Sequence, residues 1–127
     1  MKALISSVLL LAISVAGWLV FLNYTHDTLH SMMNQIKEEV LIQVEAENWE
    51  EAGDNFDKVS EKWHKEKKRY ALFLDSSAIL DTDFSVARAK GYLEAKDVSL
   101  ATGELKCIVE QLGFLHANEK VTWENLF

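Results

Sequence analysis

The sequence contains no proline and only five glycines among its 127 residues. Both residues mark turns, so their scarcity excludes collagen-like tracts, flexible linkers and a turn-rich all-β domain. Long uninterrupted helices are the expected structure. Cysteine is nearly absent as well, and the single Cys107 cannot form an intramolecular disulfide. We expect Cys107 to be a small buried residue on a helix, although a lone thiol can also pair between chains.

An excess of basic residues is also missing, because 13 Lys and Arg stand against 20 Asp and Glu. Binding to nucleic acid needs a net basic surface, so nucleic acid is excluded as a partner. We find no glycine-rich phosphate loop, nucleophile elbow or Cys-x-x-Cys pair. Asp81 and Asp83 are close in sequence, but residues two apart on a helix do not face each other. We therefore predict no enzymatic activity, no cofactor and no small-molecule substrate.

One long apolar run is present at the start of the chain. Residues 3–22 carry no charge, and a helix of that length spans about 30 Å, the hydrocarbon thickness of a bilayer. Lys2 precedes the run and Lys37 is the first basic residue after it, which predicts a cytoplasmic amino terminus. We expect an uncleaved signal anchor over residues 1–25 and an extracytoplasmic body over residues 26–127, in a cell membrane that the chain crosses once.

A cleaved signal peptide is the main alternative for this segment. Ser14-Val15-Ala16 offers a small-x-small cleavage site after Ala16. The apolar run continues beyond it to Leu22, however, and Trp18 and Tyr24 suit the interfacial belt of a retained span. A buried helix of a soluble protein is a third possibility.

The body shows helical periodicity throughout. Apolar residues recur three or four positions apart in four stretches, which predicts four helices. The expected buried faces are Leu29, Met33, Ile36, Val40 and Val44; Trp49, Ala52, Phe56, Val59, Trp63, Glu66, Tyr70 and Phe73; Leu80, Phe84, Ala87, Gly91 and Ala95; and Val98, Ala101, Leu105, Ile108, Leu112 and Leu115. The predicted fold class is all-α, an N-terminal transmembrane helix that continues into a small antiparallel bundle of about four helices. Stacked hairpins like tetratricopeptide units are the structural rival, but no 34-residue repeat is evident.

Individual residues indicate where the helices begin, and one charged residue interrupts an apolar face. Asn48, Asp75 and Asp97 are expected N-caps, and Gly91 is expected to let a neighbouring helix approach closely. Glu66 is the only charged residue of its seam. It either pairs across helices or lies at an exposed end of the seam, and its basic neighbours favour the exposed position.

Two surfaces are candidates for binding. The first is any uncovered part of the aromatic seam, for contact with another membrane or envelope protein or with a second copy, because large aromatics dominate interfaces. Its residues are Trp49, Phe56, Trp63 and Tyr70, with Trp123 and Phe127 as second choice. The second is a basic segment over residues 62–69 that suits anionic lipid or cell-wall polymer. Its residues are Lys62, Lys65, Lys67, Lys68 and Arg69.

His26 and His30 are separated by one helical turn, a usable spacing for two zinc ligands. Two ligands do not make a site, so a polar collar outside the membrane is the preferred interpretation, and no metal is predicted.

Several stretches together resemble a known family: Asn48-Trp49 and Trp63, the GYLEAKD stretch of residues 91–97, Glu104-Leu105, and the closing TWENLF of residues 122–127. They resemble small single-span helical proteins of anaerobic, spore-forming Gram-positive bacteria, a family known only as a domain of unknown function. The resemblance implies a membrane-anchored helical protein with an envelope or spore-associated role. It implies no catalytic residues, because none are defined for the family.

Overall fold

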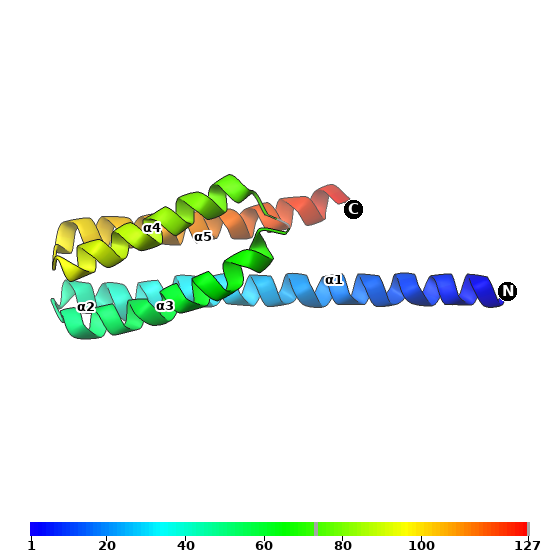
Figure 1. Cartoon of the computed structure of the whole chain (residues 1–127), viewed down its shortest axis with the longest axis horizontal. Coiled ribbons are helices and arrows are strands. Elements are labelled where there is room, and N and C mark those ends of the chain that lie inside the picture. Colours follow the sequence, from blue (N-terminus) through cyan, green and yellow to red (C-terminus); the bar gives the residue numbers. More distant parts are fainter. Residues whose placement is uncertain (73, 127) are drawn as a thin grey trace.

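The computed structural model describes the backbone of residues 1–72 and 74–126, and side chains as far as residue 117. Within this part of the chain all regular structure is helical. The elements are α1 (Lys2–Gln35), η1 (Ile36–Val40), α2 (Leu41–Glu45), α3 (Trp49–Tyr70), α4 (Ser76–Glu94) and α5 (Val98–Leu126). They form an up-and-down bundle of four helices, in which α1, η1 and α2 act as one rod (Figure 1). The predicted all-α bundle is confirmed.

The first rod runs without a break from the apolar stretch into the bundle. Its buried apolar positions are Leu29, Met32, Ile36, Val40 and Val44, so Met32 rather than Met33 lies deepest. The last three steps are each four residues long, and in a regular α-helix such steps rotate the buried face by about 40° per turn. The wider π-turn of η1 lies within these steps and keeps Ile36, Val40 and Val44 on the core side.

The core lies between the four helices along the length of α3. Its largest fully buried side chains are Trp63, Tyr70 and Phe56, and they pack against apolar residues of the other helices. Burial of each such side chain contributes about 1.5–3 kcal/mol, so these three residues make a large contribution to the stability of the bundle. The other large members are Leu29, Met32, Ile36, Leu105, Ile108, Leu112 and Leu115.

The turns show which helix-end predictions hold. Asp75 and Asp97 cap α4 and α5, because their carboxylates accept hydrogen bonds from Ser77 N (3.0 Å) and Leu100 N (2.9 Å). The Asn48 side chain instead donates to Glu51, so it makes no cap bond to the backbone. At the far end of the bundle, the turns after α2 and α4 each contain a residue with positive φ two positions beyond the helix, namely Glu47 (57°) and Lys96 (56°).

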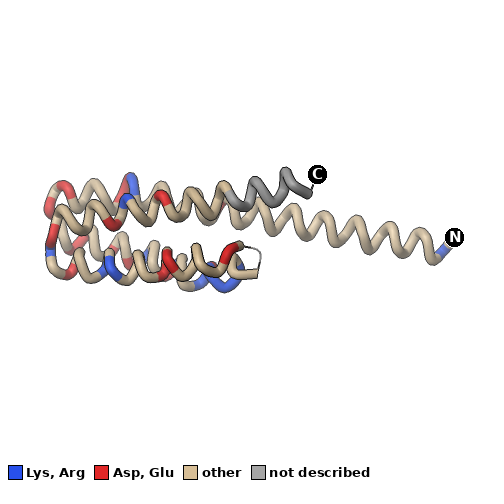
Figure 2. Tube along the Cα trace, turned by 90° about the horizontal axis from the view of Figure 1, so that it is seen from above, with Lys and Arg blue, Asp and Glu red and all other residues tan. Residues whose placement is uncertain are grey.

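The apolar stretch of α1 projects from one end of the bundle as an uncharged helix (Figure 2). Its leucines, isoleucines and valines are exposed, from Leu4 to Val20. In the described part of the chain this is the one helix that is long and apolar enough to cross a membrane, and none of its most apolar window is buried.

Candidate functional site

The aromatic seam of α3 faces the inside of the bundle. Phe56, Trp63 and Tyr70 are fully buried and Trp49 is half-buried. The bundle therefore leaves none of the first three uncovered for a partner. The side chains of Trp123 and Phe127, the second-choice contacts, lie outside the described residues, as does Phe73, the last predicted member of the seam.

Glu66 is buried, with 2% of its surface exposed, so the preferred exposed position is wrong. Tyr24 Oη donates a 2.7 Å hydrogen bond to Glu66 Oε1, and Arg69 Nη1 lies 3.6 Å from Oε2. The alternative prediction, a polar seam residue paired across helices, is the one the structure supports. The basic neighbours do not expose Glu66, because Tyr24 of α1 and Arg69 of its own helix lie against the carboxylate.

Further polar contacts join the carboxyl end of α3 to the part of α1 that follows the apolar run. The Thr28 and Tyr70 hydroxyls lie 2.5 Å apart, and the Lys62 ammonium donates a 2.8 Å hydrogen bond to Ser31 Oγ. These contacts come one to three turns after the apolar run of α1 ends. The carboxyl end of α3 therefore lies where α1 leaves the bundle.

The basic segment divides into paired and unpaired side chains. Lys67 binds Asp83 and Arg69 packs over the ring of Tyr24 at 5.3 Å, in addition to the contacts given above. Lys65 and Lys68 are exposed and make no hydrogen bond or ion pair within the part of the chain described. Figure 2 shows basic residues gathered at this end of α3. Two cations are thus available to an external anion without any loss of internal contacts.

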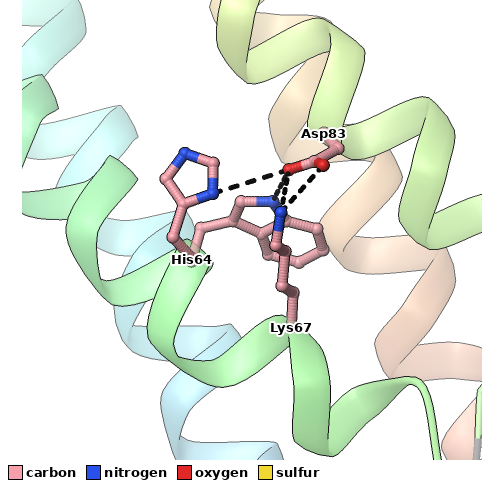
Figure 3. Close-up of polar contacts among 4 residues, drawn as sticks. His64, Lys67 and Asp83 are labelled. Atoms are coloured by element: carbon pink, nitrogen blue, oxygen red, sulfur yellow. Dashed lines mark hydrogen bonds and ion pairs between the residues drawn. The ribbon is translucent and has the colours of Figure 1, made fainter.

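Asp83 of α4 accepts hydrogen bonds from two residues of α3, and a third residue of α3, His64, lies nearby (Figure 3). Trp63 Nε1 and Lys67 Nζ lie 3.0 Å and 2.9 Å from its oxygens, and His64 Nδ1 lies 3.7 Å away. Partial burial alone would raise the pKa of Asp83. The hydrogen bonds from Lys67 and Trp63, with the charges of Lys67 and His64, outweigh burial, so the pKa lies below its usual value. The arrangement ties α3 to α4 and leaves this carboxylate ionised.

The histidine pair of α1 acquires a third member from α5. The rings of His26 and His30 stack at 6.3 Å between centroids, and His116 Nε2 lies 2.5 Å from His26 Nδ1. The two nitrogens are thus in direct contact, whereas two ligands of one tetrahedral zinc lie more than about 3 Å apart, given Zn–N bonds of about 2.0–2.1 Å. Among the described residues no group of three or more side chains is arranged to hold a metal ion.

Helix α4 buries a different face from the one predicted. Leu80 and Phe84 are 51% and 54% exposed, and Ala87, Gly91 and Ala95 are exposed with them. The buried face consists of Ile79, Thr82, Ser85, Val86, Ala89 and Leu93. A Cβ built on Gly91 meets no atom within 4 Å, so the predicted close helix approach is wrong within the monomer.

The outward face of α4 is therefore an apolar stripe that the bundle does not use. We call Leu80, Phe84, Ala87 and Gly91 the α4 stripe. Its spacing of four, three and four residues is that of a coiled-coil seam, and the two small residues would let a partner helix approach closely.

Shallow grooves flank this stripe on both sides. The groove between α3 and α4 has a volume of about 560 Å³ and is lined by residues that include His64, Asp83 and Phe84. The groove between α4 and α5 has a volume of about 370 Å³ and is lined by residues that include Cys107 and Phe114. Cys107 is exposed, so the prediction that it is buried is wrong.

The chain was compared with known proteins. A family model described as a domain of unknown function (DUF4363) matches residues 19–126. No curated protein and no solved structure matches the chain.

Proposed function

The chain belongs to this family of domains of unknown function, so its role must be inferred from its own residues, and we propose that it is a membrane-anchored interaction module. A single span holds the protein in the cell membrane. The helical bundle stands on the extracytoplasmic side and docks on another membrane or envelope protein or on a second copy. The proposal includes no catalytic residue, no cofactor and no small-molecule substrate.

The anchor rests on the exposure of residues 3–22. Burying that apolar surface in lipid is strongly favourable, whereas leaving it in water is not. Lys2 before the span and Lys37 well after it favour a cytoplasmic amino terminus. The unbroken helix also continues past Ala16 into the bundle, which supports retention over cleavage.

The observation that carries the docking role is the α4 stripe. Phe84 and Leu80 stand half-exposed on the face opposite the core, with small residues in line beyond them. A water-soluble helix normally has one apolar face, and α4 has two. The stripe replaces the aromatic seam of α3 as the surface that we assign to a partner.

Cross-linking in cells tests this assignment. A photoreactive phenylalanine analogue at Phe84 should give discrete cross-linked products, and the same analogue at Ile42, an equally exposed residue of α2, should not. Membrane fractionation and mass spectrometry would then identify the product as a second copy or another protein. Equal yields at both positions would contradict docking on the stripe.

A second candidate function is binding of anionic lipid or cell-wall polymer through residues 62–69. The exposure of Lys65 and Lys68 favours it. Salt separates the two functions, because charge-driven binding should collapse between about 0.05 and about 0.3 M ionic strength, whereas apolar docking should persist.

A further inference from the structure

The end of α3 lies at the height of the membrane surface, provided that the proposed span is correct. Tyr24 follows Leu22, the last residue of the apolar run, by two positions, or about 3 Å along the helix axis. Tyr24 bonds Glu66 and its ring lies under Arg69. The last turn of α3 is therefore level with the headgroups that surround α1.

The turn that follows α3 differs in composition from the other two turns of the bundle. It reads Ala-Leu-Phe-Leu over residues 71–74 and has no charge before Asp75. Leu72 is 73% exposed, the highest value among the large apolar side chains of the bundle that the structure describes. The turns at the far end read Ala-Glu-Asn over residues 46–48 and Ala-Lys-Asp over residues 95–97, as expected for turns in water.

Charge complements this apolar turn. Lys65, Lys68 and Arg69 precede it in the last two turns of α3 and are exposed, and Arg69 also contacts Glu66 and the ring of Tyr24. Segments that lie in a membrane interface typically combine exposed apolar side chains with several cations. The apolar side chain enters the boundary of the acyl chains, and the cations bind the phosphates of the headgroups. A cell-wall polymer would supply the anions but would give the exposed leucine nothing to enter.

We infer that the α3–α4 turn is a second membrane contact of this protein. Leu72 inserts into the interface, and Lys65, Lys68 and Arg69 bind anionic phospholipid headgroups of the bilayer that α1 crosses. The inference deepens the second candidate function and rests on the proposed span. Its consequence is that the bundle is held at two points and stands upright on the membrane.

Three single-cysteine variants of the full chain test this contact. In a Cys107→Ser background, an environment-sensitive fluorophore is attached through Leu10→Cys, Leu72→Cys or Leu100→Cys. Leu10 lies in the span and Leu100 is an exposed leucine at the far end of the bundle, 50% exposed. Each protein is placed in nanodiscs of phosphatidylcholine with or without 30% phosphatidylglycerol, and quenching by lipid-borne nitroxides is measured.

We expect strong quenching at position 10, intermediate quenching at position 72 that rises at least twofold with phosphatidylglycerol, and none at position 100. Lys65→Gln with Lys68→Gln should remove the phosphatidylglycerol-dependent rise, whereas Lys37→Gln with Lys58→Gln, two exposed lysines elsewhere, should leave it intact. Quenching at 72 no greater than at 100, with position 10 still quenched, would overturn the second contact and leave the span standing. Absence of quenching at position 10 would overturn the span itself.

Discussion

Tyr24 and Glu66 lie 42 positions apart and are joined by a 2.7 Å hydrogen bond between the phenol and a buried carboxylate. The bond fixes the register of α3 against α1 at the point where α1 leaves the bundle. It also partly compensates the cost of burying Glu66, whose second oxygen accepts no hydrogen bond from the described residues and lies 3.6 Å from Arg69 Nη1.

Removal of the phenol should destabilise the bundle, and removal of both partners should not. We expect Tyr24→Phe to lower the free energy of unfolding by about 1–2 kcal/mol, because a buried carboxylate loses its donor. Tyr24→Phe with Glu66→Met should recover most of that loss, since an apolar pair no longer needs a donor. Urea unfolding of the full chain in detergent micelles, followed by circular dichroism, measures both.

Tyr92→Phe is the matched control, because the half-buried hydroxyl of Tyr92 makes no hydrogen bond within the described residues. It should change stability by less than about 0.5 kcal/mol. If the double variant were less stable than Tyr24→Phe alone, the Glu66 carboxylate would stabilise the fold through contacts other than its hydrogen bond with Tyr24, which would contradict the argument.

Asp83 should make the free energy of unfolding of the bundle depend on pH. Its pKa is lowered in the folded state from 3.8, so its contribution is complete above that value and is lost as the pH falls through the folded-state pKa. Asp83→Asn keeps an acceptor for Trp63 but loses the ion pair with Lys67, and should cost about 1–2 kcal/mol at pH 7. The difference from the parent should shrink between about pH 5 and about pH 2.5.

Asp81→Asn is the control for Asp83, because this exposed residue of the same helix makes no ion pair within the described residues. Its difference from the parent should stay near zero at every pH. A gap for Asp83→Asn that stays constant down to pH 2.5 would mean that the ionised carboxylate contributes nothing.

The far-end turns should accept glycine with a gain in stability. Glu47 and Lys96 have φ of 57° and 56°, a conformation that costs a side chain about 1 kcal/mol and costs glycine little. Glu47→Gly and Lys96→Gly should each raise the free energy of unfolding by about 0.5–1 kcal/mol. Lys58→Gly, in the interior of α3, should lower it by about 1 kcal/mol, and a loss at all three positions would contradict the argument.

Gly91 separates monomer stability from partner binding. A methyl group at this position meets no atom within 4 Å, so Gly91→Ala should stabilise the helix by about 0.5–1 kcal/mol. If a partner helix packs on the α4 stripe, the same methyl group should reduce the cross-linking yield from Phe84. Gly103 is an equally open helical position on α5, so Gly103→Ala should raise the stability of the monomer in the same way without lowering the cross-linking yield from Phe84.

The sequence predicts the helices of this protein well and their contacts less well. The seam of α3 and the caps Asp75 and Asp97 are local patterns, and the structure confirms them. The buried face of α4 was hidden because Thr82 and Ser85 point to the core, where Thr82 bonds the carbonyl of Ala78 and Ser85 accepts from Arg88. Polar residues that are satisfied within their own helix do not register as core in an apolar pattern.

The fate of Glu66 depended on information that a local pattern does not contain. Its partner Tyr24 belongs to another helix, and the pairing follows from the register of two rods rather than from the neighbours of either residue. The α4 stripe and Leu72 could be recognised as exposed apolar surface only from the packed structure, because a sequence alone does not show which apolar residues the core will cover.

The unbroken helix from the apolar run into the core has a mechanical consequence. No loop or hinge separates residues 3–22 from the buried Leu29 and Ile36, so the rod transmits both torque and axial displacement. A rotation of the apolar stretch by one residue would turn the first rod by about 100° against the other three helices, which packing forbids. A displacement of residues 3–22 should therefore move the buried face of the first rod, and the helices packed against it, by the same amount.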